Sequence, residues 1–128
     1  MRDLPNSITA GVFRSANAEL GWRRDEIEQA LLAIRDNEQA VLGGEVWLIV
    51  GPNQWHGLIP DRSGGVPGVW TWNTLPRSST ESWRAYCERT VNESLDAVRQ
   101  MKVEEETLAE LADQLRFNAT YIDETEVV

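Results

Sequence analysis

The sequence is poor in the residues from which small catalytic and metal sites are usually built. It contains one cysteine (Cys87), one histidine (His56) and a single lysine among its 12 basic residues. One cysteine cannot form a disulfide framework, and with one histidine it cannot supply the ligands of a structural zinc site. No apolar run approaches the roughly 18 residues typical of a membrane span. We therefore expect no cofactor, no metal and no membrane partner.

The sequence also lacks an excess of positive charge. The chain has 21 acidic and 12 basic residues, which gives a net charge of -9. Nucleic-acid binding requires a basic surface, so the composition argues against a nucleic-acid partner. Residues 93–128 hold ten acids and three bases, so they carry -7 of this charge. Two interpretations remain open: an acidic surface that maintains solubility, or a field that attracts a basic partner.

The length and composition predict one globular domain. The 128 residues are 41% hydrophobic and show no repeat, low-complexity segment or internal linker. We expect a single domain over 1–128, with an irregular segment over 1–15 and an acidic tail over 123–128. No apolar signal-peptide core occurs near the start, so the expected location is the cytoplasm.

Two main helices are predicted from apolar residues repeating every three to four positions. The first covers about 25–38, with Asp25 as its cap and Glu28 completing a capping box. The longest covers about 80–102, after the capping cluster at 78–81. A shorter helix is expected at 104–113.

Strands are predicted in four places. The apolar run at 46–50 indicates a strand buried on both faces, and 57–59 and 69–73 complete an expected antiparallel meander. Alternation over 115–122 predicts a last strand. The resulting fold is α+β, with a mostly antiparallel sheet of about four strands and two main helices packed on one face.

Catalytic residues are difficult to find in this sequence. His56 is the one candidate proton shuttle near neutral pH, and Asp61 lies near it, but a solvated loop histidine is the simpler interpretation. Cys87 falls on the apolar stripe of the long helix, as a small core residue would. The glycine pairs at 43–44 and 64–65 lack the lysine of a phosphate loop. We therefore expect no enzymatic activity.

Six tryptophans are many for a chain of this length. Most should lie in the core, and the remainder are candidates for recognition. Trp55 is preferred as a partner contact because it lies in a polar loop rich in glycine and proline. The alternative, which stays open, is that it folds back over the sheet edge. Trp70 and Trp72 alternate onto one face, where with His56 they would suit a ligand pocket.

Several segments together resemble a family of bacterial polymorphic-toxin immunity proteins. They are the sequences NAELGW at 17–22, AVLGGEVW at 40–47, WTW at 70–72, ESW at 81–83 and LRFNATY at 115–121. The resemblance covers roughly 15–122. It implies a small cytoplasmic protein, without catalysis, that binds and neutralises a cognate toxin domain. It transfers no catalytic residues and does not identify the toxin.

The leading hypothesis is therefore an immunity protein whose partner is a cognate toxin of basic charge. Its expected partner-binding residues are Trp55, His56, Asp61, Trp70, Trp72, Glu104, Glu105 and Glu106. A small-molecule binding domain with a tryptophan-lined pocket is the alternative, and an enzyme using His56 with Asp61 is a third hypothesis.

Overall fold

A long central strand organises the fold. The computed structural model describes residues 3–56, 58–59, 68–103 and 109–126. Its helices are α1 (Asn6–Thr9), α2 (Arg24–Asp36) and α3 (Trp83–Gln100), with 3-10 helices η1 (Ala109–Gln114) and η2 (Glu124–Glu126). Its strands are β1 (Phe13–Arg14), β2 (Leu20–Gly21), β3 (Ala40–Gly51), β4 (Gln54–His56), β5 (Leu58–Ile59), β6 (Gly68–Val69), β7 (Thr71–Asn73) and β8 (Leu115–Ile122).

Every pairing in the main sheet is antiparallel and involves β3. On one side β3 pairs with β8 along most of its length, and on the other it pairs with β7 and then β4. Strands β1 and β2 form a separate two-stranded sheet, as do β5 and β6. The segment at 57–59 was expected to join the antiparallel meander. Its strand, β5, pairs with β6 and not with β3.

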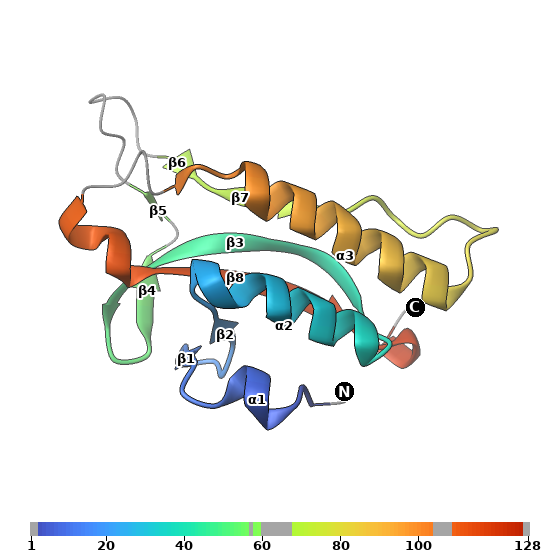
Figure 1. The fold of residues 1–128 in the computed structure, drawn as a ribbon, viewed down its shortest axis with the longest axis horizontal. Coiled ribbons are helices and arrows are strands. Elements are labelled where there is room, and N and C mark those ends of the chain that lie inside the picture. Colours follow the sequence, from blue (N-terminus) through green and yellow to red (C-terminus); the bar gives the residue numbers. More distant parts are fainter. Residues whose placement is uncertain (1–2, 57, 60–67, 104–108, 127–128) are drawn as a thin grey trace.

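The two long helices cover the same face of the main sheet. Helix α3 packs against β3 and β7, α2 packs against β8, and the helices also contact each other (Figure 1). The predicted α+β architecture is confirmed. No helix among the described residues is long and apolar enough to cross a membrane.

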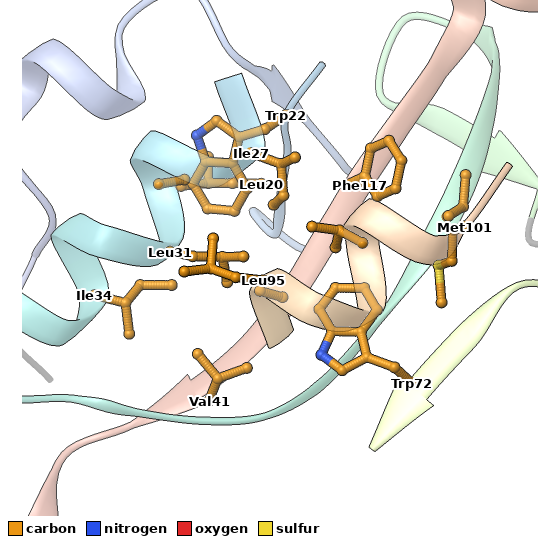
Figure 2. Packing of buried hydrophobic residues seen from close by; sticks show 14 of the residues in the cluster. Leu20, Trp22, Ile27, Leu31, Ile34, Val41, Trp72, Leu95, Met101 and Phe117 are labelled. Atoms are coloured by element: carbon orange, nitrogen blue, oxygen red, sulfur yellow. The ribbon is translucent and has the colours of Figure 1, made fainter. Parts of the chain in front are cut away.

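The hydrophobic core fills the space between these helices and the sheet. Trp22, Ile27, Leu31, Val46 and Phe117 are each no more than 1% exposed, and several of them appear in Figure 2. Large buried side chains of this kind provide most of the stability of a domain. The apolar stripe predicted for the first helix is therefore correct.

Both long helices begin at residues other than those predicted. Helix α2 starts at Arg24, and the Arg23 backbone N–H donates to the Glu26 carboxylate at 3.0 Å, so Asp25 is not the cap. Helix α3 starts at Trp83, after Ser82, whose Oγ accepts from the Ala85 N–H at 3.1 Å. Several residues of each segment can cap a helix, and tertiary contacts select one.

The central strand is longer than predicted, because Gly43 and Gly44 lie inside it. A Cβ at Gly44 would lie 2.2 Å from the Trp72 ring and 2.2 Å from the Asn118 carbonyl oxygen. Glycine is therefore required for Trp72 to pack on the strand. A register shift between Val41 and Gly43 also bends the strand here. Val46 and Trp47 are fully buried on opposite faces, as predicted, whereas Val50 is 47% exposed.

The shorter predicted helix lies partly outside the described residues. The described part of 104–113 belongs to η1, which is a 3-10 helix. Residues of the expected irregular N-terminal segment form α1 and β1. Trp22 ties this segment to the sheet, because its Nε1 donates to the Ile8 carbonyl at 2.9 Å and its backbone pairs with Phe117.

Candidate functional site

The structure brings two of the predicted site residues together. Trp55 and His56 are neighbours on β4, and both line a shallow hollow with residues of the β1–β2 loop. Trp55 is half-buried because its ring stacks on Trp47, with centroids 4.4 Å apart. Trp55 therefore lies on a strand and packs against the sheet, which corresponds to the second of the two arrangements that the sequence left open.

Trp70 and Trp72 face the hydrophobic core. Both pack into the cluster beneath the helices, and Trp72 is only 7% exposed. The Nε1 of Trp72 donates to the Ser94 hydroxyl of α3 at 3.0 Å. Trp70 and Trp72 do share one face of the sheet, as predicted, but this face packs under α3. His56 does not join them, because it lines the hollow beside Trp55.

Four of the six indole N–H groups have partners within the protein. Trp22 and Trp83 donate to backbone carbonyls, Trp72 donates to Ser94, and Trp47 donates to the Glu45 carboxylate at 2.9 Å. Within the described part of the chain, the Trp55 and Trp70 indoles make no such bond. Of these two residues, Trp55 lies on the side of the sheet away from the helices. It therefore remains a candidate for contact with a partner protein.

The remaining predicted contacts are acidic. Asp61, Glu104, Glu105 and Glu106 lie outside the described residues. Two other acids of the C-terminal third form ion pairs within the protein. A carboxylate oxygen of Glu93 is paired with Arg89, and one of Glu124 lies 3.5 Å from Arg77.

A hollow that the sequence did not reveal lies on the face of the sheet opposite the helices. We call this the open face and define it by the side chains of Glu45, Thr71, Asn73, Asn118 and Thr120. The register of β3 places Glu45 beside both Thr71 and Asn118. The hollow over these residues has a volume of about 440 Å³. Polar side chains on alternate positions of three strands therefore form its floor.

A second hollow continues from the first along the outer edge of β8. It has a volume of about 600 Å³ and is also lined by Asp3, by residues of α1 and by the β1–β2 hairpin, including Arg14. Glu19, Asn118 and Thr120 line both hollows. The two together form one continuous concave surface.

Asn118 holds the rim of this surface in place. Its side chain is 5% exposed, and its Nδ2 donates to the Leu20 carbonyl at 2.9 Å. This bond fixes the β1–β2 hairpin beside β8, and Glu19 immediately precedes that hairpin strand. The alternation of β8 indicated that Asn118 leaves the helix-covered face, but no sequence pattern predicts its contact with Leu20.

The continuous concave surface carries more negative than positive charge. Among the described residues that line it, Asp3, Glu19 and Glu45 are acidic and Arg14 is basic. The nearby phenol of Tyr121 has a raised pKa, chiefly because it is partly buried and also because Asp3 is close. The surface thus combines carboxylates with a partly desolvated environment.

The described candidates for catalytic chemistry are few. Burial raises the pKa of the Cys87 thiol to about 11, so the reactive thiolate is scarce near neutral pH. Among the residues in the described ranges, no three His, Cys, Asp or Glu side chains form a group that could hold a metal ion. The open face presents carboxylates, amides and hydroxyls, which are suited to hydrogen bonding and ion pairing with a partner.

Comparison with known proteins gives no family assignment: no protein-family model, curated protein or solved structure matches the chain.

Proposed function

We propose that this chain is an immunity protein that binds and neutralises a cognate toxin domain in the cytoplasm, without catalysis. The observation that carries the proposal is its charge: a net -9 in a small domain with no catalytic constellation found in its sequence. The sequence resemblance to polymorphic-toxin immunity proteins supports the same function.

The charge suits a basic partner. Many antibacterial toxins bind nucleic acid through a cationic cleft, and an acidic protein can occupy such a cleft. Complementary charge also accelerates association, because it steers the two proteins together. The half-buried Trp55 would add an apolar contact to the charged contacts between the two proteins.

Calorimetric titration tests the proposal. The ligand is the C-terminal domain of the polypeptide encoded beside this gene, and the titration is repeated at two salt concentrations. We expect tight binding that weakens as salt rises, because exposed charges are screened beyond about 10 Å at 0.1 M salt. Absence of binding to a folded toxin domain would overturn the proposal.

A second titration tests the contribution of Trp55. Removal of a tryptophan at the centre of an interface costs about 2 kcal/mol or more of binding free energy. Trp55→Ala should therefore weaken binding, whereas Leu75→Ala, at a residue that is 68% exposed and lies in the segment before α3, should not. Equal affinities of the two variants would remove Trp55 from the interface while leaving the function in place.

A further inference from the structure

Carboxylates on the helix-covered side are mostly matched by arginines. Arg89 pairs with Glu81 at 2.7 Å and also with Glu93, and Arg99 pairs with Glu28 at 2.7 Å. The remaining pair along α3 joins Arg84 to Glu88 at 3.6 Å. A partner approaching this side meets charges that are already neutralised over short distances.

Carboxylates on the concave surface formed by the open face and the adjoining hollow are different. In the described ranges, Asp3, Glu19 and Glu45 form no ion pair with any arginine. The Oε1 atom of Glu45 accepts a hydrogen bond from the Trp47 indole at 2.9 Å, which fixes the position of the carboxylate but leaves its charge uncompensated. The concave surface therefore keeps an excess of negative charge that the protein itself does not neutralise.

The shape of this surface increases the effect of these charges. Glu45 is half-buried at the floor of one hollow, and Glu19 stands on the rim shared by both. Field lines concentrate in a concave region with protein walls, and a cation placed there is screened less than one on a convex surface. A long cationic side chain can reach such a site while its stem packs on the walls.

We propose that the open face docks a loop of the basic partner and that an arginine or lysine of this loop is held between Glu19 and Glu45. This inference rests on the proposed function and adds the binding face to it. The hydroxyls and amides of Thr71, Asn73 and Thr120 surround the carboxylates and can hydrogen-bond the backbone of the loop. Charge complementarity between the unpaired carboxylates and a cationic partner is the basis of this assignment.

Two matched double variants test the docking face. Glu19→Gln with Glu45→Gln removes two negative charges from the open face and retains an acceptor oxygen for the Trp47 indole. Glu88→Gln with Asp96→Asn removes two negative charges from exposed positions on α3. Both variants therefore have the same net charge. Thermal unfolding of each confirms that it is folded before titration with the toxin domain.

The expected result is a loss of affinity that depends on position. The open-face variant should bind about tenfold or more weakly, since close interfacial charge pairs couple strongly, and the α3 variant should change by less than about threefold. Equal weakening of both would mean that only the overall charge matters, and would overturn the proposed docking face.

A third variant tests the face by adding a charge. Asn73 is exposed on the rim of the hollow, so Asn73→Arg places a cation where we expect the partner's cation to bind. It should weaken binding by at least as much as the open-face double variant. Unchanged affinity of both open-face variants, with tight binding by the wild type, would remove the docking face but keep the immunity function. Absence of wild-type binding would remove both.

Discussion

Around Glu45 the two faces of the main sheet are built from the same strands but have opposite chemistry, whereas two residues further along β3 Trp47 is buried on the side away from the helices. On the helix-covered face, Phe117 and Val46 are fully buried and contact the helices. On the open face, Thr120 and Thr71 are exposed around a polar hollow. Because successive residues of a strand alternate between faces, one strand can supply core packing and a recognition surface at once.

The arginines are also divided between these faces. Arg24 of α2 lies over the Phe117 ring at 4.6 Å, and its guanidinium donates to the carbonyls of Val98 in the last turn of α3 and of Met101, the C-cap residue. Such contacts satisfy the free carbonyls at a helix C-terminus and complement its negative dipole. The Arg24 cation is thus used within the helical layer.

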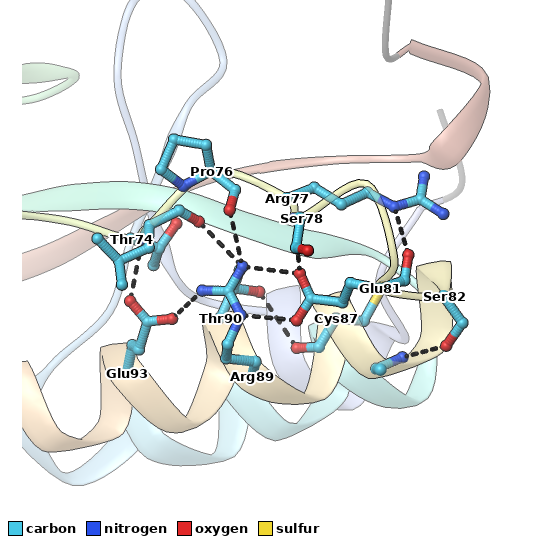
Figure 3. Close-up of polar contacts among 12 residues, drawn as sticks. Thr74, Pro76, Arg77, Ser78, Glu81, Ser82, Cys87, Arg89, Thr90 and Glu93 are labelled. Atoms are coloured by element: carbon cyan, nitrogen blue, oxygen red, sulfur yellow. Dashed lines mark hydrogen bonds and ion pairs between the residues drawn. The ribbon is translucent and has the colours of Figure 1, made fainter.

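Arg89 contacts both carboxylates and backbone carbonyls. It pairs with Glu81 and Glu93, and its Nη2 also donates to the carbonyls of Leu75 and Pro76 at 3.1 Å (Figure 3). Together these bonds attach the segment before α3 to the helix. The charges of Glu81 and Glu93 are therefore compensated locally by Arg89.

The largest effect that tests this comparison is expected in β8. Phe117→Ala empties a fully buried site and should lower the free energy of unfolding by about 3–5 kcal/mol. Thr120→Ala, three residues further along the same strand, should change it by less than about 0.5 kcal/mol. Urea unfolding measures both. A similar cost at the two positions would mean that the open face also carries core packing.

A smaller effect is expected at Gly44. An added methyl group would collide with the Trp72 ring and the Asn118 carbonyl, so Gly44→Ala should cost about 1–3 kcal/mol through overpacking. Gly51→Ala is the control, because its nearest neighbour is the flexible Gln54 side chain at 3.1 Å. If both variants unfold at the same urea concentration, the close approach of Trp72 to β3 is not essential for stability.

The elements with strong periodicity could be predicted from the sequence. The stripe of Ile27, Leu31 and Ile34 indicated α2, and the alternation around Phe117 indicated β8. Such patterns reflect contacts that repeat locally along one element. The strand through Gly43 was not predicted, because its glycines are explained only by Trp72, which comes nearly thirty residues later.

The candidate site was predicted less well than the fold. Trp55 and His56 do lie together, but Trp72 serves the core and not a ligand pocket. The open face depends on Glu19, Glu45 and Asn118, which are brought together by strand register and by one side-chain bond to the β1–β2 hairpin. A contact between distant residues leaves no periodic signal in the sequence.

The most subtle test concerns pH and the paired carboxylates of the helical side. Hydrogen bonding to Arg89 lowers the pKa of Glu81 below its ordinary value of 4.5. A carboxyl group with a lower pKa in the folded state stabilises the fold above its unfolded pKa, and this stabilisation is lost as the pH falls through the folded pKa. The urea midpoint of the wild type should therefore decrease on acidification below about pH 4.5.

Substitution of Glu81 isolates its share of this decrease. Glu81→Gln cannot ionise, so its urea midpoint should be lower than that of the wild type at pH 7 and should fall less steeply on acidification. Ser79→Ala, in the same exposed segment, is the non-titrating control and should keep the wild-type slope. An unchanged slope in Glu81→Gln would show that the Arg89 pair does not stabilise the fold. The helical side would then hold carboxylates as available to a partner as those of the open face, and the contrast between the two sides would have to rest on shape alone.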